Sequence, residues 1–270
     1  MFPFLHEFIR FRLLMLLSVL IFISGCTSRD GDLNLFSIED DEQMGARYNE
    51  QILGDPRSWP VLPEAGYPEV YSGLRKIVDK ILQSDDLLHR DEFSWKVLVL
   101  QDDTILNAFC TPGGYIYVYT GLIKYLDSED QLAGVLGHEI AHADLRHSTE
   151  QITKNTGISI VLKLIFGDGS LVGDMAGGMA NLTFSRGDET EADLQSVRYL
   201  YDTDYDPRGV ARFFEKMEEK GETLGPLVFL STHPNPENRV ERIMKEWELL
   251  GSKKGKTFKA EYQQMKEYLP

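Results

Sequence analysis

Two histidines lie four residues apart in the segment His138-Glu139-Ile140-Ala141-His142. Residues at this spacing share one face of an α-helix, so both imidazoles could reach the same cation. Zn²⁺ binds neutral imidazole readily, and a catalytic zinc keeps one position open for a water molecule, whose pKa it lowers to about 7. Glu139 could accept a proton from that water as it attacks a carbonyl group. The segment therefore predicts a metallopeptidase helix with Glu139 as its general base.

The residues around this motif have the pattern of a packed helix. Ser128 and Gln131 have the types and spacing of an N-terminal capping box. An apolar face follows at helical spacing, formed by Leu132, Val135, Leu136, Ile140 and Ala143. We expect a helix that begins after Ser128 and could continue beyond His147. His147 itself is interpreted as a buried structural histidine rather than as a metal ligand.

A catalytic zinc needs a third protein ligand, and the sequence offers a downstream acidic segment. The metzincin class would place glycine and histidine where this chain has Leu145 and Ser148, which disfavours that class. Glu189 and Asp193 are four residues apart, on one face of a predicted helix. Glu189 could bind the metal while Asp193 hydrogen-bonds the far nitrogen of a ligand histidine. The alternative is the acidic first turn of an ordinary solvent-exposed helix.

The first 25 residues have the pattern of a secretory signal. Arg10 and Arg12 precede an apolar run over 13–23, which is short for a membrane span. Residues 23–26 resemble a bacterial lipobox, so Cys26 would carry lipid and become the mature N-terminus. Thr27 follows Cys26 where an aspartate would signal inner-membrane retention, so we expect an outer-membrane anchor facing the periplasm. The alternative is an uncleaved anchor helix.

The composition limits the partners. The formal net charge of the 270-residue chain is −15, which argues against nucleic acid or anionic lipid as an electrostatic partner. The chain has two cysteines, Cys26 and Cys110. If Cys26 carries lipid, no intramolecular disulfide can form, and Cys110 is expected to be a small buried side chain.

The patterning of the rest of the chain predicts an α+β fold that is mainly α, with a small antiparallel sheet beside the metal-binding helix. Proline and glycine mark a turn at 111–114 between two short strands. Residues 157–187 are glycine-rich and are expected to be irregular. The predicted organisation is a signal peptide at 1–25, a tether at 26–36, a zinc metallopeptidase domain at 37–250 and a C-terminal helical tail at 251–270. Helices are expected at 37–52, 69–82, 188–201, 207–221, 236–250 and 259–268, and strands at 93–100, 107–110 and 115–120.

The His-Glu-x-x-His helix, the segment 185–193 and the segment 107–114 together resemble the HtpX and CAAX prenyl-protease family of gluzincin zinc metallopeptidases. The resemblance covers roughly 39–243 and is strongest to the soluble periplasmic lipoprotein branch, the BepA-, LoiP- and Oma-like proteases. It implies a zincin-like domain that holds one Zn²⁺ through His138, His142 and Glu189. It also implies Glu139 as the base and Asp193 as the support of a ligand histidine. The chain lacks the multiple membrane spans of the prenyl proteases, which disfavours a prenyl-processing role.

Two further segments gain meaning from this resemblance. Residues 107–119 are similar to the edge strand of the family's active site, which could bind extended substrate through main-chain hydrogen bonds. The residues in this expectation are Asn107, Ala108, Phe109, Gly113 and Gly114. The alternative is an ordinary core hairpin.

The segment 231–234 resembles a His-Pro segment of the same family, together with Arg239. His233 could occupy the open metal position and hold the enzyme latent. It could also stabilise the transition state, or serve the fold alone.

The leading hypothesis is therefore a zinc endopeptidase that cleaves misfolded or unassembled proteins of the bacterial envelope. Its partners would be unfolded or misassembled envelope polypeptides, and the outer membrane through the lipid. A second hypothesis is an envelope chaperone or assembly factor with a latent or mainly structural zinc site. A third is a lipoprotein interaction module whose catalytic site is inactive.

Overall fold

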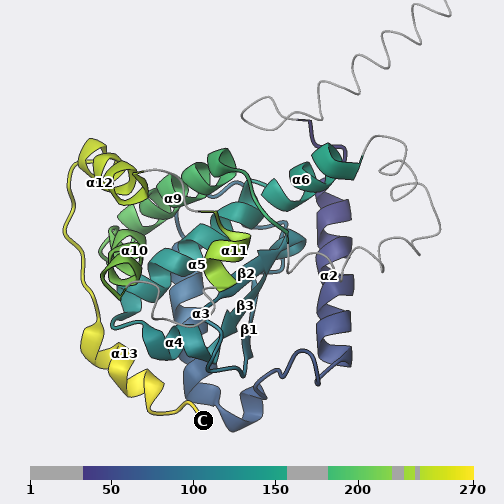
Figure 1. Cartoon of the computed structure of the whole chain (residues 1–270), viewed down its shortest axis with the longest axis horizontal. Helices are drawn as coiled ribbons and strands as arrows, with labels where there is room; N and C mark the ends of the chain where they lie inside the picture. Colours follow the sequence, from purple (N-terminus) through teal and green to yellow (C-terminus); the bar gives the residue numbers. More distant parts are fainter. Residues whose placement is uncertain (1–32, 157–181, 221–227, 235–237) are drawn as a thin grey trace, which may run out of the picture.

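The structure is a computed structural model that describes residues 33–156, 182–220, 228–234 and 238–270 (Figure 1). The described part is mainly helical, with one small sheet. The helices are α2 (Ile38–Gly54), α3 (Pro68–Ile81), α4 (Thr120–Tyr125), α5 (Glu129–Asp144), α6 (His147–Thr156), α9 (Arg186–Tyr201), α10 (Gly209–Lys220), α11 (Val228–Thr232), α12 (Arg239–Leu249) and α13 (Lys259–Lys266), with short 3₁₀ turns η1 (Glu64–Gly66) and η2 (Pro112–Gly114). The strands are β1 (Lys96–Leu100), β2 (Ala108–Thr111) and β3 (Tyr115–Tyr119).

The centre of the fold is α5, the helix that carries the His-Glu-x-x-His motif. Every one of its 16 residues is buried, because α9, α10, α3 and the sheet pack around it. Small residues allow this close packing. A Cβ at Gly134 would lie 2.2 Å from the backbone nitrogen of Val210 at the start of α10. A Cβ at Gly137 would lie 2.8 Å from the Ser196 hydroxyl on α9.

The sheet has the strand order β1-β3-β2 (Figure 1). The hairpin of β2 and β3 is antiparallel, as expected, and its turn η2 contains two glycines with positive φ, Gly113 and Gly114. β1 instead pairs parallel to β3, so the sheet is mixed and not purely antiparallel. After Leu100 the chain reverses and forms β2 at the far edge of the sheet. It then reverses again, and β3 lies between β2 and β1, antiparallel to β2 and parallel to β1. In the parallel register of β1 and β3, Val99 lies opposite Val118.

The start of α5 differs from the expected capping box. The Ser128 hydroxyl donates to a carboxylate oxygen of Asp130, while the Gln131 side chain accepts from the backbone N–H of Asp127. Ser128 therefore makes no side-chain cap. Capping boxes form instead at Ser37 on α2 and at Ser185 on α9, each with an aspartate at the third helical position.

α5 and α6 are two separate helices, whereas the sequence pattern allows one helix that continues beyond His147. α5 ends at Asp144, and Arg146 adopts a left-handed conformation with φ of 63° before α6 begins at His147. The Arg146 guanidinium donates to Asp41 and to the backbone carbonyls of Phe36 and Ser37, so the break is anchored on the start of α2.

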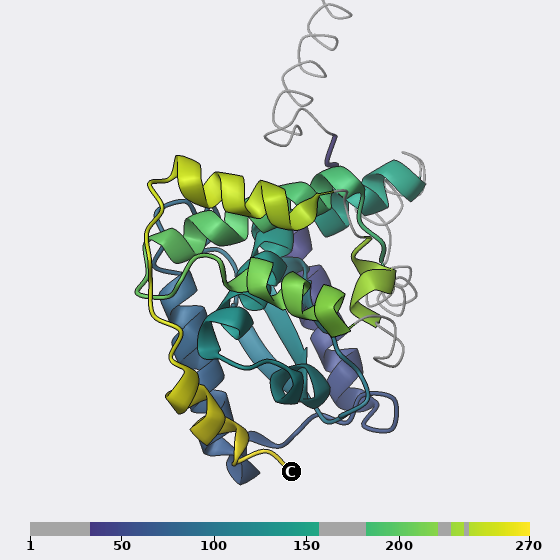
Figure 2. The same cartoon turned by 60° about the vertical axis from the view of Figure 1, so that its left-hand side comes forward.

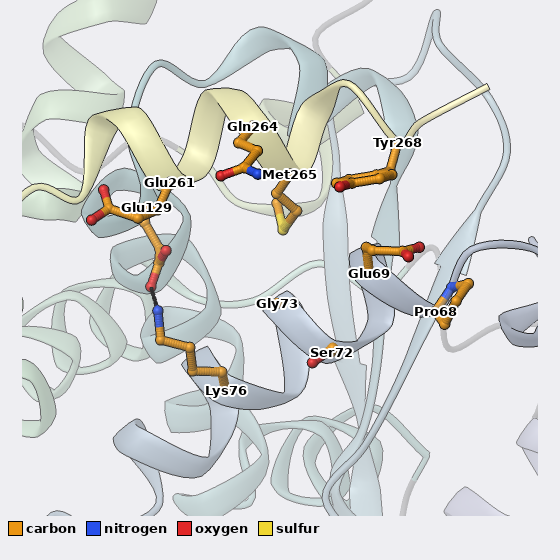
Figure 3. A pocket seen from close by; sticks show the side chains of 10 residues that line it. All are labelled: Pro68, Glu69, Ser72, Gly73, Lys76, Glu129, Glu261, Gln264, Met265 and Tyr268. Carbon is orange, nitrogen blue, oxygen red and sulfur yellow. Dashed lines mark hydrogen bonds and ion pairs between the residues drawn. The ribbon is translucent and has the colours of Figure 1, made fainter.

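The two C-terminal helices, α12 and α13, pack on other helices of the fold (Figure 2). α12 packs on α9 and α10, and α13 packs on α3. A groove of about 500 Å³ runs between α3 and α13 (Figure 3), and no residue of the metal-binding motif lines it. Among the described residues, no helix is both long enough and apolar enough to traverse a lipid bilayer.

Candidate metal centre

His138 and His142 present their Nε2 atoms to each other from successive turns of α5. The two nitrogens are 3.1 Å apart, and both side chains are fully buried. The α-helical spacing places the rings on one face, as the sequence predicts. Two imidazole nitrogens that face each other in a site without solvent need a cation or a proton between them.

Glu189 reaches the same point from the first turn of α9. Its two carboxylate oxygens lie 3.5 Å from Nε2 of His138 and 3.5 Å from Nε2 of His142. The capping box at Ser185 starts α9 at this place, and the dense packing of α9 on α5 directs Glu189 inward. Burial raises the pKa of this carboxyl, but the hydrogen bonds and charges of the surrounding histidines outweigh burial and lower the pKa overall. Glu189 is therefore a carboxylate.

His233 adds a fourth donor from the segment after α11. Its Nδ1 lies 2.9 Å from a Glu189 oxygen and 3.3 Å from Nε2 of His138. The ring is buried and stacks on Phe229, with centroids 4.5 Å apart. Burial lowers the pKa of His233, but Glu139 and Glu189 outweigh it and raise the pKa overall.

The donor set fits a zinc ion. Zinc bonds of about 2.0–2.1 Å at tetrahedral angles separate ligand atoms by about 3.3 Å. The separations among the four residues run from 2.9 to 3.5 Å along the contacts above. All four donor atoms lie within 4.8 Å of one another. Three imidazoles and one carboxylate are ligand types that zinc prefers.

Glu139 lies beside this cluster and is 1% exposed. One of its oxygens is 3.5 Å from Nε2 of His233. Burial is the main influence on this carboxyl and raises its pKa, while His233 and His138 partly oppose the rise. A carboxylate with a raised pKa is a better proton acceptor near neutral pH, as a general base requires.

Asp193 lies one turn after Glu189 and contacts the opposite side of His138. Its carboxylate is 2.9 Å from the Nδ1 atom of His138. Arg239, at the start of α12, donates two hydrogen bonds to Asp193 and one to Glu189. The guanidinium also lies over the Phe214 ring, 3.7 Å from its centroid. Arg239 thus compensates the charge of two buried carboxylates.

Two further residues flank His142: His147, which is buried as expected, and Phe184, for which the sequence analysis contains no expectation. His147 lies 2.9 Å from it, Nδ1 to Nδ1, across the break between α5 and α6. The Phe184 ring stacks on His142, with centroids 3.9 Å apart and planes at 20°. Burial lowers the pKa of His142 far below its ordinary value, so the imidazole is neutral, the form that binds a metal.

The expected substrate strand divides into two parts. Ala108 and Phe109 lie in β2, which is an edge strand of the described sheet and contacts α5, and Asn107 immediately precedes it. Burial raises the pKa of Glu139, and the backbone amide of Cys110 in the same strand partly opposes this rise. Gly113 and Gly114 are in the η2 turn, where added Cβ atoms would meet Glu42 and Trp95 respectively.

Of the two cysteines, the structure describes Cys110. Cys110 is buried and free, with its thiol pKa raised mainly by burial. Cys26, the predicted lipidation site, lies outside the described residues, as do the signal peptide and most of the tether.

The chain resembles known peptidases over the part that holds this site. The model of peptidase family M48 matches residues 71–247. The mitochondrial metalloendopeptidase OMA1 of Arabidopsis thaliana is 40% identical over 158 residues, which cover 57% of this chain and 32% of that protein. OMA1 of Schizosaccharomyces pombe is 35% identical over 58% of this chain and 47% of that protein.

The beta-barrel assembly-enhancing protease of Escherichia coli strain K12 is 32% identical over 221 residues, which cover 76% of this chain and 43% of that protein. The chain spans from about a third to a half of the length of these relatives. The family match covers more than half of the chain and includes the whole donor cluster. The chain therefore belongs to peptidase family M48, a family of metallopeptidases.

Proposed function

We propose that this chain is a zinc-dependent endopeptidase of the bacterial cell envelope that cleaves misfolded or unassembled outer-membrane and periplasmic proteins. One observation carries the catalytic part. A buried carboxylate with a raised pKa, Glu139, lies beside a buried cluster of four possible metal ligands, His138, His142, Glu189 and His233. This juxtaposition suits hydrolysis of a peptide bond by a metal-activated water.

The residues would divide the chemistry among them. When bound, zinc supplies Lewis acidity to the peptide carbonyl and to the attacking water. His138, His142 and Glu189 would hold the ion, and Asp193 would keep His138 in the orientation that binding requires. Glu139 accepts a proton from the attacking water and passes it to the leaving amine. The edge of β2 that does not pair with β3 would align an extended substrate through main-chain hydrogen bonds.

Substitution of the base tests this proposal. We expect Glu139→Gln to retain one zinc per chain, measured by mass spectrometry of metals, and to lose cleavage of unfolded casein by about 10²–10⁴-fold. Glu218→Gln, on the exposed part of α10, is the matched control and should behave as the unchanged protein. Undiminished cleavage by Glu139→Gln would reject the mechanism.

Metal removal is the second test. A chelator should abolish cleavage, and added zinc should restore it. Because the ligands are buried in the folded protein, zinc should also raise the melting temperature; at 100 times the dissociation constant it contributes about 2.7 kcal/mol. Absence of both effects would exclude a zinc site here.

The envelope location rests on two observations. Residues 23–26 resemble a lipobox, and an Escherichia coli relative is named for β-barrel assembly. The OMA1 relatives are mitochondrial, so membership of the family does not determine the compartment. In a Gram-negative host, we expect palmitate labelling and outer-membrane fractionation that Cys26→Ala abolishes. Labelling that survives this substitution would refute lipid attachment at Cys26.

The position of His233 favours a second candidate, an assembly factor or chaperone with a latent zinc site. Its Nδ1 lies among the other donors, where it completes a set of four protein ligands. A zinc ion with four protein ligands is usually structural. If the Glu139→Gln protein corrects an outer-membrane assembly defect as well as the unchanged protein does, the chaperone function is the better description.

A further inference from the structure

The ligand histidines have different supports on the side away from the cluster. His138 contacts the carboxylate of Asp193, which Arg239 holds. His142 contacts another imidazole, that of His147, through the 2.9 Å contact between the two Nδ1 atoms. His147 is 3% exposed, and its Nε2 atom lies 3.4 Å from a carboxylate oxygen of Glu191 on α9.

The positions of the nitrogens determine where the protons must be. Nε2 of His142 faces the other donors, so a metal would bind there and that nitrogen must carry no proton. A neutral imidazole then carries its proton on Nδ1, which donates to His147. Nδ1 of His147 must therefore accept, which leaves its own proton on Nε2, directed at Glu191. The donors run in one direction, from His142 to His147 to Glu191.

The interruption between α5 and α6 makes this contact possible. On a continuous helix, five residues correspond to a rotation of about 140°, so His147 would point away from His142. The left-handed conformation of Arg146, with φ of 63°, turns the chain and returns His147 to the His142 ring. The hydrogen bonds from Arg146 to Asp41 and Phe36 hold the turn.

We propose that His147 is a positioning residue that fixes His142 in the Nδ1–H tautomer, and that Glu191 selects the Nε2–H tautomer of His147. The inference rests on the proposed metal site but goes beyond it, because His147 is outside the donor cluster. Residues that orient a ligand histidine typically change metal affinity 10- to 100-fold when they are replaced.

Side-chain NMR tests the tautomers directly in the intact protein. Long-range ¹H–¹⁵N correlation spectra of the zinc-loaded protein distinguish a protonated Nδ1 from a protonated Nε2. We expect His142 to be protonated on Nδ1 only and His147 on Nε2 only. A His147 ring protonated on Nδ1, or on both nitrogens, would overturn the proposal, because it could not accept from His142.

Zinc affinity, measured by competition with a chelator, gives a second readout. We expect His147→Leu to weaken binding by about 10- to 100-fold. His147→Asn keeps an acceptor oxygen near the Nδ1 position and should recover most of the affinity. Glu218→Ala, exposed on α10, should leave affinity unchanged.

Equal losses for His147→Leu and His147→Asn would contradict a hydrogen-bonding role. If the unchanged protein binds no zinc, the proposed function fails. If it binds zinc with the opposite His147 tautomer, only the present inference fails.

Discussion

His233 and Glu139 approach each other at the metal centre, with Nε2 of His233 3.5 Å from a Glu139 carboxylate oxygen. The other nitrogen of the same ring lies among the metal-binding donors, 2.9 Å from Glu189. One imidazole therefore lies in the donor cluster and also neighbours Glu139, the proposed general base. In this arrangement the substrate carbonyl could approach the metal only after His233 moves.

Removal of this ring should activate the enzyme. If the open state makes up about a tenth of the molecules, His233→Ala should raise the rate of casein cleavage about tenfold, because every molecule is then accessible. The measurement is kcat/KM at matched zinc content, with Ser231→Ala, exposed in the same segment, as control. A lower rate would instead assign His233 to transition-state stabilisation, and an unchanged rate would leave it a structural role.

Arg239 should be among the most sensitive positions for stability. It is the cation that contacts both Asp193 and Glu189, and its side chain is 2% exposed. Arg239→Met leaves two buried carboxylates without that partner and should cost about 3–5 kcal/mol of unfolding free energy in urea.

Arg239→Lys should recover little of this loss, since an ammonium cannot make the paired hydrogen bonds of a guanidinium. Arg242→Ala, one turn along α12 and exposed, should change stability by less than about 0.5 kcal/mol. A small effect of Arg239→Met in the metal-free protein would show that the charges are compensated elsewhere.

The sequence was sufficient to predict those parts of the site whose geometry depends on local interactions within one helix. His138 and His142 share a helix face because of their spacing, and Glu189 and Asp193 do so for the same reason. In the structure, Asp193 contacts the far nitrogen of His138, as the spacing suggested. The match to family M48 supports the metallopeptidase interpretation of these segments.

Local patterns failed for the cap of α5 and for the pairing of β1. The Ser128 hydroxyl donates to Asp130 and so does not cap α5, although its spacing to Gln131 suits a capping box. The parallel pairing of β1 with β3 depends on where the connection after Leu100 places β2. The hydrophobic periodicity of the sequence does not indicate that position.

The support of His142 by His147 was also beyond sequence reasoning. It depends on a left-handed turn at Arg146, a residue type that gives no signal for that conformation.

The close approach of α5 and α10 predicts a marked difference between two glycines. A Cβ at Gly134 would lie 2.2 Å from the backbone nitrogen of Val210, so Gly134→Ala must displace α10 and should cost about 1–3 kcal/mol. Gly54, at the end of α2, has no atom within 4 Å of an added Cβ, so Gly54→Ala should be neutral or stabilise by up to about 1 kcal/mol. Denaturant unfolding of both variants checks this. Equal effects of the two substitutions would mean that α5 and α10 are less closely packed than the structure shows.

Asp206 should make stability depend on acidic pH. Burial raises the pKa of this carboxyl, but hydrogen bonds from Arg208, with help from Arg212, outweigh burial and lower the pKa below its ordinary value of 3.8. An acid with a lowered folded-state pKa contributes stability above its unfolded-state pKa, and the contribution disappears as the pH falls through the folded-state value.

We therefore expect the unfolding free energy of the metal-free protein to fall more steeply below about pH 4 than that of Asp206→Asn, which has no charge to lose. The metal-free form is the right sample because protonation of zinc ligands would add its own pH dependence. At neutral pH, Asp206→Asn should be the less stable of the two, since Arg208 and Arg212 lose a charged partner. Parallel pH profiles for the two proteins would show that the ion pairs at Asp206 contribute nothing to folding.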